Sequence, residues 1–294
     1  MDNLRYAAID TGSNAIRLLI ADVVENSGII SFKKTLFIRI PLRLGSDSFE
    51  DQKISDNKAK DLVRTMNAFS YLMKVFKVKD YMACATSAMR EAHNGLEIIK
   101  KNKKKTNINL KIIDGQYEAG IIYAIHAEQR LQQKKNYLYI DVGGGSTQLT
   151  FFSGDEMIDS RSFNIGTIRI LNHQDHAEQW AAMRKWINKL LSDKTNTTGV
   201  GTGGNINKIH QLADKKSGKP ISFDELKNTY SRLTSYSLDE RITILGLNED
   251  RADVIIPASE IYLKVMKWAN INNLLVPRLG LVDGMIHQLV ERNG

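Results

Sequence analysis

A strand, a glycine-containing turn and a second strand occur twice in this chain, about 130 residues apart. In the first copy, the apolar run YAAI ends at Asp10, and the turn TGSN leads into a second apolar run, IRLLIADVV. The second copy spans residues 137–152, where LYI and QLTFF flank the turn sequence DVGGGST. Apolar runs separated by turn residues predict strand-turn-strand units. Because each copy would open its own lobe, the repeat predicts two similar domains.

Length and composition support this division. The chain has 294 residues, more than one domain usually contains, and its 42% hydrophobic content is sufficient for ordinary buried cores. With 4 prolines and 25% charged residues, long disordered segments are not expected. We therefore expect an α/β fold of two mixed-sheet lobes, residues 1–124 and residues 125–294, with a cleft between them. The last helix could pack back on the first lobe.

Apolar spacing predicts the remaining elements. The first half should contain a third strand (ISFKKTLFIRIPL), a helix over residues 56–76, a strand (YMACAT), a helix from Ser87, a strand (LKIID) and a helix from Tyr117. The second half should contain a helix over residues 180–191, a strand leading into GVGTGG, and a helix from Asn205. It should close with another helix, a strand (LLVP) and a helix from Leu281.

Sequence-wide features indicate the cellular compartment and the class of partner. The sequence offers neither a signal peptide nor an apolar run long enough to cross a bilayer, so we expect a cytoplasmic protein without a membrane partner. The net charge of +8 favours anionic partners without identifying them. The basic run at residues 100–105 is interpreted as a solvated helix end, and Cys84, which has no second cysteine to pair with, as a buried structural residue.

The two turns carry the candidate chemistry. In DTGSN, glycine allows backbone N–H groups to point into one concavity, and the hydroxyl side chains add donors suited to phosphate oxygens. Taken alone, this turn could be only a hairpin turn. Three consecutive glycines in DVGGGST exceed what a tight hairpin needs, which indicates that another group approaches the backbone closely. Both turns follow an aspartate at a strand end, and together they favour phosphate binding.

Five segments resemble, in order, the motifs of the exopolyphosphatase / guanosine pentaphosphate phosphohydrolase family: IDTGSN, ATSAMREAHN, IIDGQYEA, IDVGGGST and GLVDGM. That family belongs to the acetate kinase, sugar kinase, heat-shock and actin superfamily. The resemblance covers essentially the whole chain and implies two ribonuclease-H-like lobes of the actin-like ATPase type, in the short form without a C-terminal helical extension. It also implies a magnesium-dependent active cleft that releases orthophosphate from polyphosphate ends or from guanosine pentaphosphate.

The resemblance assigns roles to individual residues. Glu118 would position or deprotonate the attacking water, and Arg90 would bind phosphate oxygens as the leaving group gains charge. Asp10, Asp141 and Gln148 would hold Mg²⁺ or its waters. The substrate phosphates would be bound by Thr11, Gly12, Ser13, Asn14, Gly143, Gly144, Gly145, Ser146, Gly203 and Gly204. By its sequence context alone, Glu118 would be a solvated residue of a first helical turn. The context of Arg90 alone leaves a surface arginine and a phosphate-binding arginine equally open.

Two positions depart from the family pattern. Gln148 occupies a position where a carboxylate is usual, and because an amide carries no negative charge, we expect weaker Mg²⁺ binding. Tyr117 occupies a position that is commonly acidic. These changes bear on catalytic rate and substrate preference more than on the fold.

Other motifs support competing functions less well. GVGTGG fits GxGxxG, with Asp224 at a distance suited to a ribose-binding acid, but the preceding SDKTNTT is too polar for the buried central strand that a dinucleotide fold requires. No P-loop signature is present. His173 and His176 lack a third ligand at useful spacing and are interpreted as ordinary histidines. Trp180 and Trp186 are interpreted as core residues.

Three functions stay open. The family motifs favour a phosphohydrolase that acts on inorganic polyphosphate or guanosine pentaphosphate. The alternatives are a superfamily kinase that transfers the phosphoryl group to an organic acceptor, and a sensor that binds guanosine tetraphosphate or polyphosphate with little or no catalysis. A specific nucleic-acid partner is not expected, because it would leave the paired turns unexplained. The sequence allows a homodimer.

Overall fold

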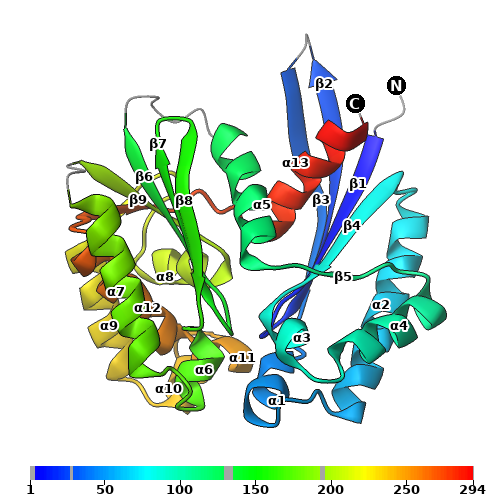
Figure 1. The fold of residues 1–294 in the computed structure, drawn as a ribbon, viewed down its shortest axis with the longest axis horizontal. Helices are drawn as coiled ribbons and strands as arrows, with labels where there is room; N and C mark the ends of the chain where they lie inside the picture. Colours follow the sequence, from blue (N-terminus) through cyan, green and yellow to red (C-terminus); the bar gives the residue numbers. More distant parts are fainter. Residues whose placement is uncertain (1–3, 27–28, 129–134, 193–195, 294) are drawn as a thin grey trace. The chain divides into compact units, whose positions relative to one another are not determined.

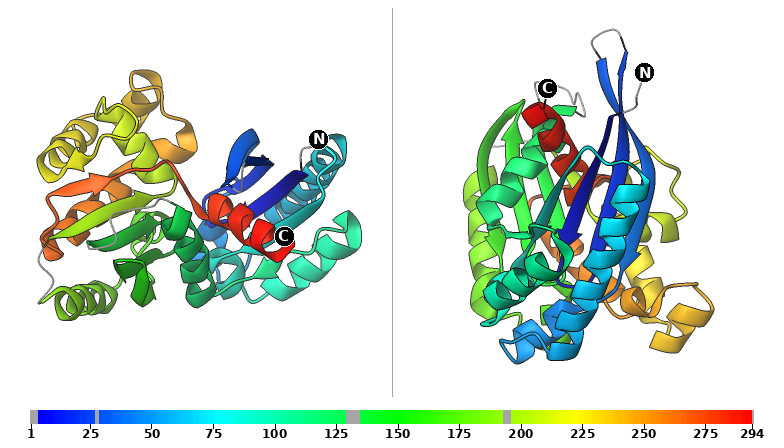
Figure 2. Two further views of the ribbon diagram at one scale, coloured as in Figure 1. Left: turned by 90° about the horizontal axis from the view of Figure 1, so that it is seen from above. Right: turned by 90° about the vertical axis from the view of Figure 1, so that its right-hand side faces the viewer.

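The computed structural model describes residues 4–26, 29–128, 135–192 and 196–293, and it divides into two compact units. Unit 1 consists of Met1–Ile125 together with Leu281–Gly294, and unit 2 of His126–Gly280. The chain therefore leaves unit 1 once and returns to it with its final helix. Figures 1 and 2 show the elements of each unit.

Unit 1 contains a five-stranded mixed sheet in the order β3-β2-β1-β4-β5. Strands β1 (Leu4–Thr11), β2 (Ile16–Asn26) and β3 (Ile29–Ile40) form an antiparallel meander. Strands β4 (Asp80–Ala85) and β5 (Lys111–Ile112) continue the sheet in parallel with β1. The sequence correctly predicts these strands, because each is an apolar or alternating run bounded by turn residues.

The helices of unit 1 are α1 (Leu44–Glu50), α2 (Asp56–Val75), α3 (Ser87–Glu91), α4 (Gly95–Thr106), α5 (Gly115–Glu128) and α13 (Leu281–Asn293). Helix α2 confirms the helix expected at residues 56–76; the Ser55 side chain caps its first turn, and one apolar stripe is buried. The helix expected from Ser87 is divided into α3 and α4. Helix α13 packs on β1, β2 and β4, where Met285 and Leu289 join Tyr6 and Ala8 in one core (Figure 1).

Unit 2 repeats this topology in a six-stranded sheet of order β10-β11-β9-β6-β7-β8. Its strands are β6 (Asn136–Val142), β7 (Thr147–Ser153), β8 (Glu156–Phe163), β9 (Thr197–Thr202), β10 (Ile221–Ser222) and β11 (Asn273–Leu275). Strands β6, β7 and β8 form the antiparallel meander, and β9 and β11 follow in parallel, as β4 and β5 do in unit 1. The strand β10 is an addition at the edge.

The helices of unit 2 are α6 (Thr167–Leu171), α7 (Ala177–Leu191), α8 (Gly204–Leu212), α9 (Phe223–Thr234), α10 (Leu238–Thr243), α11 (Glu249–Ala252) and α12 (Ile255–Trp268). Ile261 and Val265 of α12 and Met183 of α7 share a core with Leu138 and Phe151 of the sheet. Capping boxes begin α9 and α10, where a serine and a glutamate three residues later exchange hydrogen bonds with each other's backbone.

The polar residues before GVGTGG are not the buried part of a strand: Thr197 and Thr198 are half-buried, and burial begins within the motif. Strand β9 lies between β6 and β11, so it is a central parallel strand, and residues 199–202 are fully buried. The first two glycines of the GxGxxG match lie inside this strand, where a Cβ on Gly199 or Gly201 would come within 2.8 Å of the Leu274 and Ile206 side chains, respectively. These glycines therefore allow the neighbouring side chains to pack closely on the strand. A dinucleotide-binding motif needs its glycines in the turn after the strand, so this match does not indicate a dinucleotide site.

Several smaller predictions are confirmed. Cys84 is buried, the lysines of residues 100–105 are exposed at the end of α4, and His173 and His176 are exposed. Trp186 lies in the core of unit 2 and Trp180 packs against it. Across the described ranges, no helix combines the length and the apolar character that crossing a membrane requires.

Candidate phosphate-binding site

Hairpin loop 1 (residues 11–15) joins β1 to β2. The Gly12 N–H donates to the Ala15 carbonyl at 3.2 Å, which closes the turn. Asp10, the last residue before the loop, lies directly opposite Arg17 in the antiparallel register, and the two side chains form an ion pair. The pairing of β1 with β2 thus positions both the loop and the Asp10–Arg17 ion pair beside it.

Helix α1 holds hairpin loop 1 through two backbone hydrogen bonds. The Gly45 N–H donates to the Ser13 carbonyl at 2.8 Å, and the Arg43 N–H donates to the Asn14 carbonyl at 2.9 Å. In a trans peptide, the carbonyl and the following N–H point in opposite directions. The N–H groups of Asn14 and Ala15 therefore point away from α1, in the direction that an anion would use.

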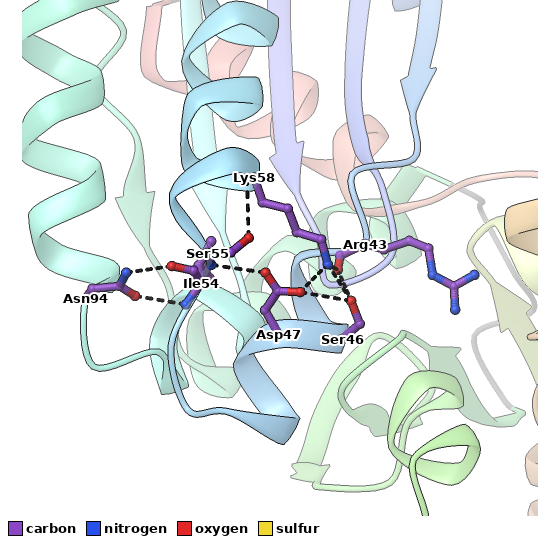
Figure 3. A network of polar contacts seen from close by, with 7 residues as sticks. All are labelled: Arg43, Ser46, Asp47, Ile54, Ser55, Lys58 and Asn94. Atoms are coloured by element: carbon purple, nitrogen blue, oxygen red, sulfur yellow. Dashed lines mark hydrogen bonds and ion pairs between the residues drawn. The ribbon is translucent and has the colours of Figure 1, made fainter.

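Figure 3 shows the polar network that fixes the start of α1 against α2. Lys58 donates to the Arg43 carbonyl at 2.8 Å and to the Ser46 hydroxyl at 2.5 Å, and it forms an ion pair with Asp47. Asp47 also accepts from the Ser55 N–H at 3.0 Å. Burial opposes ionisation of Asp47, but the hydrogen bonds from Lys58 and Ser55 lower its pKa overall. The support of hairpin loop 1 is therefore itself held by charge-assisted contacts.

Helix α3 begins beside the same loop. The Thr86 N–H donates to the Thr11 carbonyl at 3.2 Å, and the hydroxyls of Ser13 and Ser87 lie 3.0 Å apart. Ser87 thus joins the predicted residues Thr11 and Ser13.

The two predicted catalytic residues contact each other. Arg90 on α3 donates to the Ile113 carbonyl at 2.6 Å, and its Nη1 lies 3.5 Å from Oε1 of Glu118 on α5. The Glu118 side chain is mostly buried, and that of Arg90 is about one quarter exposed. Arg90 can therefore hold the Glu118 carboxylate in place, while its contact with phosphate stays a prediction.

Asp10 is a buried carboxylate next to hairpin loop 1. Burial raises the pKa of Asp10, although the charge and hydrogen bond of Arg17 oppose this rise. Its Oδ1 is buried and has no hydrogen-bond partner among the described residues. Burial also raises the pKa of the Cys84 thiol to about 12, with contributions from the carboxylates of Asp10 and Glu118. Asp10 is also the partner of Cys84 in the parallel register of β1 and β4.

Hairpin loop 2 (residues 142–146) has the same frame in unit 2. The Gly143 N–H donates to the Ser146 carbonyl at 2.9 Å, as Gly12 does in hairpin loop 1. Asp141 lies opposite Gln148 in the register, at the position that Arg17 occupies opposite Asp10. The internal repeat is therefore exact at the level of the hairpin, and its cross-strand partner differs.

The triple glycine is backed by α6. The carbonyl of Gly143 accepts from the Thr167 N–H at 3.0 Å, that of Gly144 from the Ile168 N–H at 2.8 Å, and that of Gly145 from Nε of Arg169 at 2.6 Å. By the trans-peptide geometry, the N–H groups of Gly144, Gly145 and Ser146 point away from α6. Three successive N–H groups on one side form the kind of concavity that binds an anion.

The close approach that the glycines suggested is made by Gly166. A Cβ on Gly166 would lie 2.4 Å from the Gly144 carbonyl oxygen and 2.5 Å from the Gly145 carbonyl carbon. The segment before α6 thus packs directly on the loop backbone.

Gln148 is oriented by hydroxyl groups. Its Nε2 donates to Oγ of Ser160 at 2.7 Å, and Thr150 lies 2.7 Å from the same oxygen. The amide nitrogen of Gln148 is held by β8, so its amide oxygen points away from β8. Asp141 is the cross-strand partner of Gln148, and such partners share a face of the sheet. Asp141 and Gln148 therefore offer carboxylate and amide oxygens as neighbours.

The turn after β9 lies next to this pair. Gly203 has a φ of 89°, and a Cβ there would lie 2.8 Å from Oδ1 of Asp141. Arg251 donates to the Gly204 carbonyl at 2.5 Å, and the Asn205 side chain donates to the Val142 carbonyl at 3.1 Å. The predicted residues Asp141, Gly203 and Gly204 are therefore assembled in unit 2.

Four residues of these two sites were not predicted from the sequence: Arg17, Ser87, Arg169 and Arg251. The last three reach their sites through contacts between residues 24 to 74 positions apart. Arg17 could have been found, because it follows Asp10 by the same number of residues as Gln148 follows Asp141.

The duplicated sheet topology, with an aspartate-led hairpin in each unit, is that of two-domain proteins in the actin-like ATPase superfamily. The chain belongs to the Ppx/GppA phosphatase family, whose model matches residues 20–293. The crystal structure of the Aquifex aeolicus member of the Ppx/GppA family is 25% identical, covers 99% of each chain and has a TM-score of 0.77. An exopolyphosphatase from Cytophaga hutchinsonii, 22% identical with 98% of each chain covered, has the same fold with a TM-score of 0.84. The fold class predicted from the sequence is thus confirmed.

Curated relatives are distant. The chain is 26% identical over 317 residues to a bifunctional 3-dehydroquinate synthase/phosphatase of Fusobacterium nucleatum, with 99% of this chain and 47% of that protein covered. It therefore spans about half the length of that relative. It is 22% identical over 303 residues to exopolyphosphatase 1 of Mycobacterium leprae, with 96% of this chain and 88% of that protein covered.

Proposed function

We propose that this protein is a phosphohydrolase that releases orthophosphate from the end of inorganic polyphosphate, from guanosine pentaphosphate, or from both. The observation that carries the proposal is the construction of the two hairpin loops. In each loop, the carbonyls are bonded on one side, so that successive N–H groups point to the other side. Membership of a phosphatase family and the names of the exopolyphosphatase relatives support this choice of substrate.

The side chains divide the work of phosphoryl transfer. The hairpin loops bind and orient phosphate oxygens, which accounts for much of the catalysis in this chemistry. Glu118 accepts a proton from the attacking water or orients it, and Arg90 keeps the Glu118 carboxylate in position. The prediction that both loops act on one phosphate chain in a shared cleft stays a part of this proposal.

Oxygen donors in both units suit Mg²⁺. Among the described residues, no group of three or more His, Cys, Asp or Glu forms a preassembled metal site. Mg²⁺ usually takes only one or two protein oxygens and leaves the other positions to water and substrate phosphates. Asp141 with Gln148 meets this requirement, and Asp10 offers its Oδ1, although the Arg17 guanidinium beside it opposes a second cation. A bound Mg²⁺ would neutralise phosphate charge.

A second candidate is a sensor that binds a phosphate chain and hydrolyses it slowly. Gln148 favours this candidate, because the amide lowers the negative charge available for Mg²⁺ beside Asp141. The loops would bind in the same way, and only turnover would differ.

Orthophosphate release tests the proposal. The protein is incubated with Mg²⁺ and either long-chain polyphosphate or guanosine pentaphosphate, and with ATP plus organic acids and sugars as acceptors. We expect phosphate release from at least one of the first two substrates. Binding without release would identify the sensor, and phosphoryl transfer to an acceptor would identify a kinase.

Variants of Glu118 test the mechanism. Glu118→Ala and the isosteric Glu118→Gln should lower turnover by about a hundredfold or more. Glu97, an exposed glutamate on α4, provides the matched control Glu97→Gln, which should leave turnover unchanged. Full activity in both Glu118 variants would remove this residue from the proposed role.

A further inference from the structure

Arg169 is a buried arginine with a backbone target. It is 8% exposed and lies on the short helix α6. Its Nε donates to the carbonyl of Gly145 at 2.6 Å, which is short for a nitrogen-to-oxygen hydrogen bond. Arginines are rarely buried to this degree unless their charge serves a paired contact. Its Nε hydrogen bond is made to the loop that the proposed function assigns to phosphate.

The other two bonds from α6 to this loop come from backbone N–H groups. The bond to Gly145 comes from a guanidinium side chain, which is positively charged. Hydrogen bonds from ionised groups are stronger than neutral ones, and hydrogen bonds in series polarise one another. The peptide that joins Gly145 to Ser146 is therefore held more firmly than its neighbours.

A bond to the carbonyl of this peptide acts on its N–H. The Ser146 N–H belongs to the same peptide plane as the Gly145 carbonyl and points the opposite way, away from α6. Withdrawal of electron density through the carbonyl makes the Ser146 N–H a better donor to an anion. Pre-oriented donors of this kind need no reorganisation when charge arrives.

We propose that Arg169 is a positioning residue that sets the phosphate affinity of hairpin loop 2 by fixing and polarising the peptide between Gly145 and Ser146. This inference rests on the proposed function, because it assigns the strength of a phosphate site to a residue that does not itself touch phosphate. A residue with only a structural role would affect folding stability but not the Ser146 amide specifically.

The test measures binding of inorganic tripolyphosphate at fixed Mg²⁺ by isothermal titration calorimetry. The variants are Arg169→Met, which keeps much of the side-chain volume without charge or donors, and Arg169→Lys, which keeps the charge. The control is Arg184→Gln, which removes one charge from an exposed position on α7 of the same unit. Thermal unfolding of each variant reports structural damage, and the ¹⁵N–¹H signal of Ser146 reports the peptide itself.

We expect Arg169→Met to weaken tripolyphosphate binding by about tenfold or more, the usual effect of losing a charged hydrogen bond. The Ser146 amide signal should move in the free protein. Arg169→Lys should recover part of the affinity, and Arg184→Gln should match the wild type in both readouts. If Arg169→Met does not fold, the comparison between Arg169→Lys and the wild type decides, with weaker binding and a displaced Ser146 signal expected for Arg169→Lys.

Three outcomes overturn the inference and are distinguishable. If the wild type binds tripolyphosphate and the folded Arg169 variants bind it equally well, Arg169 does not set the affinity. If Arg184→Gln weakens binding as much as Arg169→Met, long-range charge explains the effect without the peptide. A wild type that binds no phosphate chain contradicts the proposed function itself, and this inference with it.

Discussion

The two hairpin loops share one backbone frame and differ in the charge that faces their aspartates. In both, a glycine N–H closes the turn and a short helix holds the carbonyls. In unit 1, Asp10 is buried and paired with Arg17, whereas in unit 2 the half-buried Asp141 faces the neutral Gln148. The duplicated backbone motif therefore keeps its hairpin geometry while the charge opposite its aspartate differs between the two copies.

The largest effect on stability should follow the loss of the Arg17 cation beside hairpin loop 1. Arg17→Gln leaves the Asp10 carboxylate buried without its partner, and we expect a cost of about 2–3 kcal/mol, near the low end for buried pairs because Arg17 is partly exposed. Chemical denaturation measures this change. Adding Asp10→Asn should restore most of the loss, because an amide needs no counter-charge. A double variant no more stable than Arg17→Gln alone would contradict the pairing.

Gly166 and Gly45, which contact the two hairpin loops, should differ in how well they tolerate substitution by alanine. Gly166→Ala places a Cβ against the backbone of hairpin loop 2, so we expect a loss of about 1–3 kcal/mol and of most phosphate release. Gly45→Ala places a Cβ 2.7 Å from the Phe49 ring and 2.9 Å from Cβ of Ser13. Because these two contacts are to side-chain atoms, whereas those of Gly166 are to backbone atoms, the Gly45 variant should lose less stability. Equal losses would show that α1 is as rigid as α6.

The charge beside Asp141 should control the use of Mg²⁺. Gln148→Glu restores a carboxylate next to Asp141, and we expect the half-saturating Mg²⁺ concentration for phosphate release to fall by about tenfold. A titration with Mg²⁺ checks this result, and Gln179→Glu on α7 is the control for added charge. An unchanged titration would remove Gln148 from the metal environment.

The smallest effect concerns the pH dependence of Asp10. Burial raises its pKa in the folded protein, so the folded state retains a proton that the unfolded chain releases near the ordinary value of 3.8. Stability from this group is therefore full below that value and is lost as pH rises through the folded pKa. Asp10→Asn should be slightly more stable than the wild type at neutral pH, and the gain should vanish in acid. If the pKa of Asp10 is not raised, thermal unfolding will show the same difference in stability between Asp10→Asn and the wild type at every pH in this range.

Much of the fold was predictable because β1, β2, β6 and β7 are apolar runs with clear turn residues between them. Helix α2 was predictable for the same reason, since its apolar stripe and its Ser55 cap are local signals. Helices α1 and α6 were not predicted. They have 7 and 5 residues, and their first N–H groups bond to the hairpins, so their formation depends on tertiary contacts that local sequence does not record.

The site was predictable where a motif is contiguous, as in residues 10–14 and 143–146. Arg169 and Arg251 were not, because each meets its glycine carbonyl only after the chain has folded back. Gly199 and Gly201 show the converse case. Their spacing fits a phosphate motif, but only the strand pairing of β9 reveals that they make room for the side chains of Leu274 and Ile206.

The return of α13 to unit 1 has a consequence for synthesis on the ribosome. Val282, Met285, Ile286 and Leu289 complete the core around β1, yet they are translated after every residue of unit 2. The later-made unit is continuous and can finish folding first, while the earlier one waits with an apolar sheet face uncovered. Truncation near residue 280 should therefore expose β1, at the opposite end of the polypeptide from the cut.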